Sequence, residues 1–412
     1  MSARLGKSKG KRDRCLMRSD SDAAQGTLLF VCNVAWFFTS HRLEVARAAQ
    51  RNGYKVHVAA DVDREEEIAE IESHGILFHR IRVRRSATAI WGELTSIFDI
   101  YRLVSKLRPD LVHHVTIKPV LYGSLVARLL GTRSVVNALP GLGYLFTARG
   151  PLAALRREMT RMGYRFLLNG RNSLVIFQNS DDLNSFVASR TVPRKRTRLI
   201  RGSGVDLAAF ASVPEPPGIP IVVLPARMLW DKGIREFCEA AVLHRAAGGS
   251  ARFVLVGSLD PSNPSGATKS ELQALCEQTG VEWLGYRDDM VQVLAQSHIV
   301  CLPSYREGLP KALIEAAAMG RPIVSCDVPG CREVVREGIN GFLVNPRDPV
   351  SLAAAISKLV ADVGLRQSMG TAGRKLAEED FGLDSVIEKT LAVYAELASA
   401  WPPMNVEVSN GD

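Results

Sequence analysis

Glu307 and Glu315 enclose seven residues that begin Gly-Leu-Pro-Lys, and this run holds the chain's clearest candidates for chemistry. Because the two carboxylates are too far apart in the sequence to share a proton, we expect them to accept hydrogen bonds from sugar hydroxyls rather than to act as an acid–base pair. On spacing alone, a loop and a helix with two solvated glutamates explain the pattern equally well.

The run follows an apolar stretch at 299–303 that is typical of a buried parallel strand. Ligands of open α/β sheets bind beyond the carboxyl ends of the strands. Gly308 would let the backbone approach a ligand closely, and Pro310 is expected to begin the next helix. The free N–H groups and the positive dipole at that helix start, together with Lys311, suit a phosphate or diphosphate.

Strand and helix patterns alternate on both sides of a proline-rich stretch at 213–220. Strands are expected at 26–33, 54–60, 77–83, 111–116, 134–138, 174–178 and 198–201 before that stretch, and at 221–225, 253–257, 281–284, 299–303 and 322–325 after it. Helices are expected at 41–52, 65–74, 93–107, 119–130 and 310–319, with two or three more in 351–397. The alternation predicts an α/β protein with two doubly wound, Rossmann-like domains that face a central cleft.

The same pattern divides the chain into segments. We expect a disordered basic tail at 1–25, an N-terminal domain at 26–212, a Pro-rich linker at 213–220, a C-terminal domain at 221–380, and a helix within 381–412 that returns to the N-terminal domain before a final tail.

The composition is that of a soluble globular protein, because 46% of the 412 residues are hydrophobic and 23% are charged. Seven cysteines without a Cys-x-x-Cys pair argue against a disulfide framework and a zinc site. Asp61 and Asp63 follow a strand, but the acidic run after them reads as a helix start. No metal is therefore expected.

The net charge of +9 is unevenly spread, since residues 26–210 carry +12 and residues 211–412 carry −7. A basic half can face nucleic acid, a membrane surface or a phosphorylated substrate, and an arginine-rich solvated surface would give the same count. No nucleic-acid partner is expected, because aromatic–basic patches and finger spacings are missing.

A basic amphipathic helix is predicted at 151–169, where arginines alternate with Leu, Met, Tyr and Phe at helical spacing. Such a helix can contact an anionic membrane surface, or it can pack on the sheet as an ordinary helix. The apolar stretch at 28–38 is too short to span a membrane. The arginines assigned to acceptor or membrane contact are Arg156, Arg157, Arg161 and Arg165.

The run from Arg306 to Glu315 resembles the E-x7-E signature of glycosyltransferase family 4, whose members are retaining, metal-independent enzymes of the GT-B fold. The segments at 320–324, 329–335 and 338–344 are similar to those that follow the signature in that family. The segment at 227–233 is similar to the place where the family puts an Arg and a Lys on the donor diphosphate. The resemblance extends over residues 26–397 and implies a nucleotide-sugar donor with no cofactor.

The resemblance also implies a role for each matching residue of the C-terminal domain, which would bind the nucleotide sugar. Arg227 and Lys232 would neutralise the leaving diphosphate. Glu315 would hold ribose hydroxyls, and Glu307 would contact the transferred sugar as a catalytic residue. The other donor-binding residues would be Gly308, Leu309, Pro310 and Lys311 at the phosphates, and Gly257 and Tyr286 near the base.

In the N-terminal, acceptor-binding half, the segments 113–119 and 137–143 resemble a subgroup that extends sugar chains on undecaprenyl diphosphate, including N-acetylgalactosaminyltransferases. There His114 and Lys118 would act as catalytic residues on the acceptor diphosphate or the transferred proton. The loop expected at 33–41 departs from the wider family, because it lacks a Gly-Gly pair.

The implied activity is the retaining transfer of a sugar, with UDP-N-acetylhexosamine as the preferred donor, onto a lipid-linked saccharide in bacterial surface-polysaccharide assembly. The enzyme would then be peripheral on the cytoplasmic face of the cell membrane. A cytosolic transferase with a soluble acceptor is the alternative. A two-domain oxidoreductase is disfavoured, because the Gly-x-Gly pairs at 141–143 and 202–204 lack the third glycine of a dinucleotide fingerprint.

Overall fold

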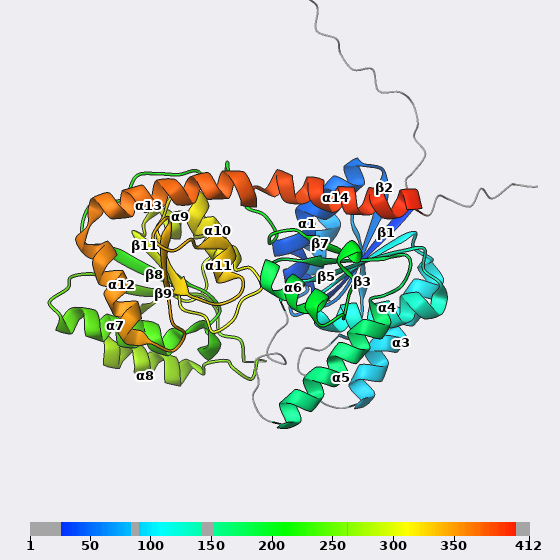
Figure 1. The fold of residues 1–412 in the computed structure, drawn as a ribbon, viewed down its shortest axis with the longest axis horizontal. Coiled ribbons are helices and arrows are strands. Elements are labelled where there is room, and N and C mark those ends of the chain that lie inside the picture. Colours follow the sequence, from blue (N-terminus) through cyan, green and yellow to red (C-terminus); the bar gives the residue numbers. More distant parts are fainter. Residues whose placement is uncertain (1–25, 84–89, 142–150, 262, 401–412) are drawn as a thin grey trace, which may run out of the picture.

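The first half of the chain folds around a seven-stranded parallel sheet with the strand order β3-β2-β1-β4-β5-β6-β7 (Figure 1). The computed structural model describes residues 26–83, 90–141, 151–261 and 263–400. The strands are β1 (Gly26–Val34), β2 (Tyr54–Asp61), β3 (Leu77–Arg80), β4 (Leu111–Val115), β5 (Ser134–Leu139), β6 (Ser173–Phe177) and β7 (Thr197–Leu199). The order reverses between β1 and β4, which makes their carboxyl ends the switch point where such sheets bind ligands.

Helices cover both faces of this sheet. One face carries α1 (Ala35–Arg51), α2 (Glu66–Ser73) and α14 (Leu383–Ala400), whose apolar side chains share one buried cluster with alternate residues of β1, β2 and β4. The other face carries α3 (Ile90–Leu107), α4 (Ile117–Leu130), α5 (Pro151–Leu167) and α6 (Ser180–Ala188).

The second half contains a six-stranded parallel sheet with the order β10-β9-β8-β11-β12-β13. Its strands are β8 (Ile221–Pro225), β9 (Arg252–Val256), β10 (Glu282–Trp283), β11 (Ile299–Leu302), β12 (Ile323–Cys326) and β13 (Gly341–Val344). Its helices are α7 (Ile234–Ala246), α8 (Lys269–Thr279), α9 (Met290–Ala295), α10 (Lys311–Ala318), α11 (Cys331–Val334), α12 (Pro349–Ala361) and α13 (Val363–Leu376).

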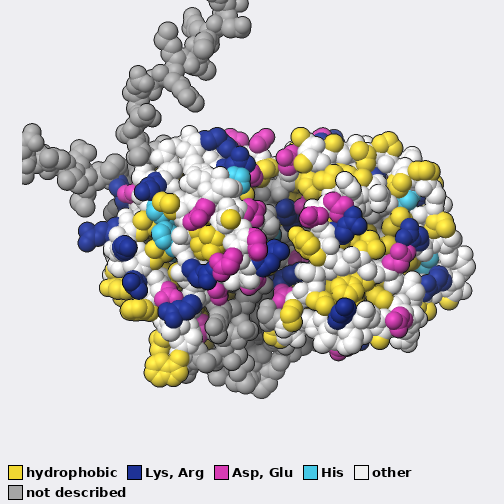
Figure 2. All heavy atoms as spheres, turned by 180° about the vertical axis from the view of Figure 1, so that it is seen from behind, with side chains coloured by type: hydrophobic (Ala, Val, Ile, Leu, Met, Phe, Trp, Pro, Cys, Tyr) yellow, Lys and Arg dark blue, Asp and Glu magenta, His cyan; other side chains and the backbone are white. Residues whose placement is uncertain are grey.

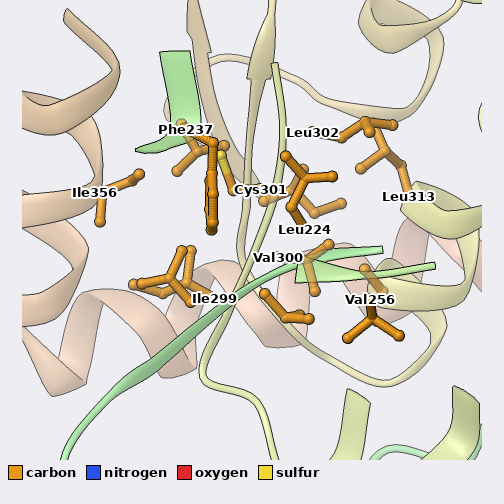
Figure 3. Close-up of a cluster of buried hydrophobic side chains, with 14 of the residues drawn as sticks. Leu224, Phe237, Val256, Ile299, Val300, Cys301, Leu302, Leu313 and Ile356 are labelled. Atoms are coloured by element: carbon orange, nitrogen blue, oxygen red, sulfur yellow. The ribbon is translucent and has the colours of Figure 1, made fainter. Parts of the chain in front are cut away.

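The core of the second domain lies between these layers. Figure 3 shows Phe237 of α7, Ile356 of α12 and Leu313 of α10 around the apolar side chains of β8 and β11. The strands are apolar at consecutive positions because both faces of a parallel sheet are covered. The predicted architecture of two Rossmann-like domains is therefore confirmed.

The chain crosses between the domains twice, and the two crossings are hydrogen-bonded to each other. Val205 donates to the carbonyl of Phe381 at 2.9 Å, and Leu383 donates to the carbonyl of Val205 at 3.0 Å. A five-residue π-helix (Ala377–Phe381) precedes the second crossing. Beyond it, α14 lies on the first domain (Figure 1). There the Tyr394 hydroxyl is 2.6 Å from Nδ1 of His113.

One local prediction is wrong, and one strand was missed. The helix predicted from 41 begins at Ala35, so most of the expected loop at 33–41 is helical. Val34 is its N-cap without a side-chain hydrogen bond, and Ala35 and Phe38 are buried one turn apart; packing on the sheet, not a capping residue, starts this helix. The short strand β13 was not predicted, because its four residues carry no clear alternation.

The described cysteines are free thiols, and all of them except Cys276 are buried. Among the helices that the structure describes, none combines the length and the apolar composition needed to cross a bilayer.

Candidate active site

Loops that follow neighbouring strands of the second sheet bring Lys232 and Glu307 together. Lys232 ends a single 3-10 turn (Trp230–Lys232) after β8, and Glu307 follows β11. The Lys232 Nζ lies 2.5 Å from Oε1 of Glu307, and both side chains are largely buried. A cation and a carboxylate thus stand at the switch point of this sheet, where a ligand is expected.

Two backbone contacts hold these loops against each other. Tyr305 donates to the carbonyl of Asp231 at 2.9 Å. Gly233 has φ +75°, and a Cβ there would lie 2.2 Å from the carbonyl oxygen of Pro303, so only glycine fits this approach. The position of Lys232 beside Glu307 is therefore fixed by backbone as well as by charge.

The Gly308–Lys311 segment touches the first domain. A Cβ on Gly308 would lie 1.2 Å from the carbonyl oxygen of Pro140, and the Asn179 amide donates to the carbonyl of Gly308 at 2.7 Å. Leu309 is buried in the core of the second domain, and α10 begins at Lys311 with Pro310 as N-cap, one residue later than predicted. The predicted phosphate loop therefore forms part of a closed contact between the domains.

Glu315 lies at a cavity of about 360 Å³ between the domains, and its side chain is 3.5 Å from Lys311. Burial raises the pKa of Glu315, and the positive charge of Lys311 partly opposes that rise. Lys311 also reaches across the cleft and donates to the carbonyl of Ser40 at 3.1 Å. Ser40 and His41 line the same cavity from α1.

Basic and acidic side chains line this cavity in equal number, with Arg42, Arg47 and Lys311 balanced by Glu44, Asp206 and Glu315. The pKa of His41 is lowered to about 3, first by burial and then by the positive charges of Lys311, Arg42 and Arg227. Arg227 bonds to Asp260 at 2.5 Å, and its guanidinium lies 5.7 Å from the Trp36 ring of the first domain. Three cations therefore lie near His41, where they could bind an anionic group.

Gly257 and Tyr286 lie near the end of β9. Gly257 has φ +153°, and a Cβ there would be 1.8 Å from the carbonyl oxygen of Ala226, while the Trp283 indole donates to its carbonyl at 3.0 Å. Gly257 is thus needed for this close packing. Tyr286 is 67% exposed, so it is not a core residue.

In the first domain, Lys118 lies at the start of a helix and forms an ion pair, whereas His114 is buried in the core. Lys118 stands in the first turn of α4 and bonds to Glu93 of α3 at 2.8 Å. His114 is fully buried, and its Nδ1 lies 2.8 Å from Oδ1 of Asn137. In this conformation His114 has no surface that a substrate could touch, and its catalytic role stays a prediction.

Between them, Thr116 adopts φ +77° and ψ +166°, a backbone conformation that is strained for a residue other than glycine. Its hydroxyl, and the side-chain oxygen of Asn33 at the end of neighbouring β1, are buried without a hydrogen-bond partner in the described part of the chain. Strain and unpaired polar atoms at this switch point make it a candidate for ligand binding.

The predicted basic helix is α5, and it is amphipathic. Tyr164 and Leu168 pack into the core, whereas Arg165 is exposed and Arg161 bonds to Glu158 at 3.4 Å. The side chains of Arg156 and Arg157 lie outside the described residues.

Contacts across the cleft bring in residues that the sequence patterns do not single out. Asp182 of α6 bonds to Arg306 at 2.7 Å, and Glu333 of α11 accepts from the backbone of Ser180 at 2.6 Å and from Arg201 at 2.8 Å. No local signal marks these pairings, because the partners lie more than a hundred residues apart. Trp36 and Asn179 were missed for the same reason, and Asp260 was missed because its partner Arg227 follows a different strand, 33 residues away.

We expect the protein to lose stability in acid through its buried histidines. Burial lowers the pKa of His114 to about 4, so His114 is neutral in the folded state, whereas the unfolded chain takes up a proton near pH 6.5. Unfolding is therefore favoured as pH falls from about 6.5 to about 4, by on the order of 3 kcal/mol for this residue.

Urea denaturation at several pH values measures this effect. His114→Gln is expected to flatten the dependence between pH 6.5 and 4, and His74→Gln, at the C-cap of α2, is the control. Equal slopes in the wild type and His114→Gln would contradict the assignment.

Known proteins resemble both halves of the chain. Residues 27–179 match the family model described as "Glycosyl transferase 4-like", and residues 219–362 match "Glycosyl transferases group 1". Together these matches cover well over half of the chain.

Similar proteins extend the match. The N,N'-diacetylbacillosaminyl-diphospho-undecaprenol α-1,3-N-acetylgalactosaminyltransferase of Campylobacter jejuni is 28% identical over 67% of this chain and 74% of its own. The UDP-Gal:α-D-GlcNAc-diphosphoundecaprenol α-1,3-galactosyltransferase of Escherichia coli is 24% identical over 74% of this chain and 80% of its own. A glycosyltransferase structure from Rickettsia africae covers 90% of this chain and 98% of its own, with a TM-score of 0.72 and 19% identity, and shows the same fold.

Proposed function

Since the chain belongs to the glycosyltransferases of the group 1 and 4-like family, with the GT-B fold, we propose that it moves an N-acetylhexosamine from UDP onto a saccharide carried by undecaprenyl diphosphate. We further propose that the reaction retains the configuration of the anomeric carbon. The observation that carries the proposal is the switch point of the second domain, where Lys232 and Arg227, each beside a carboxylate, stand at the cleft.

In this proposal the cations stabilise the leaving group. Breaking the glycosyl–phosphate bond leaves a second negative charge on the terminal phosphate of the nucleoside diphosphate, which Lys232 and Arg227 would stabilise. Glu307 is paired with Lys232 in the structure. When the donor binds, Glu307 would leave this ion pair and accept a hydrogen bond from a hydroxyl of the transferred sugar. Glu315 would accept hydrogen bonds from the ribose hydroxyls at the cavity. Tyr286 would lie near the base.

The names of two relatives support the acceptor. The Campylobacter and Escherichia enzymes are both named for acceptors on diphospho-undecaprenol, and the latter for a UDP donor. Lys118 at the first switch point, with His114 behind it, would serve the acceptor diphosphate. The basic helix α5 would face anionic lipid, which makes the enzyme peripheral on the cytoplasmic side of the membrane. A soluble acceptor is the second candidate.

A transfer assay tests this function. UDP-, GDP- and dTDP-sugars are each supplied with an undecaprenyl-diphosphate-linked saccharide or with free sugars, and the nucleoside diphosphate and the product mass are measured. We expect UDP-N-acetylhexosamine with the lipid-linked acceptor to give the highest rate, and an α-linked product from an α-linked donor by NMR.

Chelation by EDTA is expected to leave that rate unchanged, because lysine and arginine supply the charge that a metal would otherwise supply. Transfer to free sugars alone would favour the soluble-acceptor alternative. Release of no nucleoside diphosphate from any donor would overturn the proposal.

A further inference from the structure

The outer face of α3 carries a stripe of large apolar side chains. Trp91, Leu94, Phe98 and Tyr101 recur at helical spacing, and Trp91 and Phe98 are 79% and 60% exposed. Side chains on the opposite side of the same helix are buried against the sheet, among them Ile100 and Val104. We call the four exposed residues the α3 stripe. They are not needed to fill the core, so their exposure requires another explanation.

The stripe continues on neighbouring helices. Met159, Met162 and Phe166 form an exposed row on α5, and Leu129 is exposed on α4 between the two helices. Figure 1 shows α3, α4 and α5 side by side on one face of the first sheet. In Figure 2, which shows this domain from behind, hydrophobic side chains protrude at its lower edge, where α3 lies in Figure 1.

Exposed aromatic side chains are concentrated on α3 and α5. Among the exposed large hydrophobic residues that the structure describes, every Trp, Phe and Tyr except Tyr286 lies on α3 or α5. Tryptophan and tyrosine are enriched where proteins meet the interface of a bilayer, because one end of the ring is apolar and the other is polar.

The charges beside the stripe favour an anionic partner. The acids of these helices are already paired, Glu93 with Lys118, Asp99 with Arg82 and Glu158 with Arg161. Three exposed bases, Arg102, Lys106 and Arg165, make no salt bridge with any residue that the structure describes. A second copy docked by two-fold symmetry would bring these same bases together, which disfavours self-association.

The position of the stripe relates it to the cleft. Glu93 in the first turn of α3 bonds to Lys118, which stands at the carboxyl edge of the first sheet. The stripe therefore begins beside the cleft edge at Trp91 and runs away from it along the domain. If the saccharide of a lipid-linked acceptor enters the cleft, its hydrocarbon chain would lie beside the α3 stripe.

We propose that the α3 stripe, extended by the exposed row on α5, inserts into the interfacial region of an anionic lipid bilayer. The insertion is mainly apolar, and Arg102 and Lys106 add selectivity for anionic headgroups. The link to the acceptor and the lipid contact of α5 rest on the proposed function, whereas the argument for the α3 stripe does not.

Vesicle co-sedimentation of the full chain tests the insertion. The vesicles contain phosphatidylcholine with about 30% phosphatidylglycerol, or phosphatidylcholine alone. We expect the double variant Trp91→Ser/Phe98→Ser to lower the partition coefficient about ten-fold or more. The matched control is Val350→Ser/Val363→Ser, which removes exposed apolar side chains from α12 and α13 and is expected to bind like the wild type.

Two further measurements make the result unambiguous. Trp91→Phe is expected to keep binding but to lose the blue shift of tryptophan emission that vesicles cause, because Trp91 enters the interface. Arg102→Glu/Lys106→Glu is expected to remove the preference for phosphatidylglycerol vesicles. Thermal denaturation establishes that each variant is folded, which is expected because the changed side chains are exposed.

Equal binding by Trp91→Ser/Phe98→Ser and the wild type would overturn the proposal. A wild-type dimer that the same variant dissociates, without vesicle binding, would overturn it in favour of a second copy. Failure of the proposed function would appear separately, as absence of transfer to a detergent-solubilised acceptor.

Discussion

Replacing Lys232 with methionine is expected to lower the rate of sugar transfer about 10²–10³-fold without unfolding the protein. The Nζ of Lys232 lies 2.5 Å from Glu307 at the end of β11, where a leaving diphosphate would gain charge. Removal of the cation takes away that stabilisation and leaves the Glu307 carboxylate unpaired next to the same phosphates. Initial rates of nucleoside diphosphate release measure the loss.

A double-mutant cycle separates two roles for this lysine. If Lys232 only neutralised Glu307, Lys232→Met would have no further effect in a Glu307→Gln background. We expect the further loss to persist there, because the lysine acts on the donor. Lys375→Met on the exposed surface of α13 is the control, and its rate should equal that of the wild type. A Lys232→Met enzyme with the wild-type rate would refute the site.

Gly308→Ala is expected to reduce transfer at least about 10²-fold by preventing the domains from closing. A Cβ at Gly308 would lie 1.2 Å from the carbonyl oxygen of Pro140 in the other domain, a distance that no rotamer change can relieve because both atoms belong to the backbone framework. Each domain has its own core, so the variant should fold. Small-angle X-ray scattering is expected to give a larger radius of gyration than that of the wild type.

Gly364→Ala is the matched control, because the Cβ would meet no atom closer than 3.4 Å and the site lies on a surface helix. Calorimetry with UDP distinguishes blocked closure from a blocked donor site. If Gly308→Ala still binds UDP but no longer transfers the sugar, the loss is due to blocked domain closure. If it no longer binds UDP, the loss is due to a damaged phosphate-binding site. An active Gly308→Ala enzyme with an unchanged radius of gyration would contradict both explanations, blocked closure and a damaged donor site.

The sequence was sufficient for the alternation of strands and helices, because buried parallel strands are apolar throughout and are separated by recognisable turns. It also placed Lys232 and Glu307 at strand ends of one sheet, although their direct contact joins residues 75 apart and depends on the order of β8 and β11. The start of α1 was missed, because Val34 offers no capping side chain.

Contacts formed between distant segments could not be predicted in this way. The arginine–carboxylate pairs across the cleft depend on how the domains meet. The burial of His114 depends on the approach of Gly123, whose Cβ would lie 2.3 Å from the imidazole. On α3, apolar residues occur on both faces, with Ile100 inside and Phe98 outside, so periodicity alone could not show which face remains uncovered.

The return of α14 means that the first domain is not continuous in the chain. Tyr394, which bonds to His113, is synthesised 281 residues after it. During translation one apolar face of the first sheet therefore stays partly uncovered until the whole second domain has emerged from the ribosome. A gene fragment cut at the linker would encode that incomplete domain, so exchange of the whole first domain between relatives would require transplanting two separate stretches of sequence rather than one.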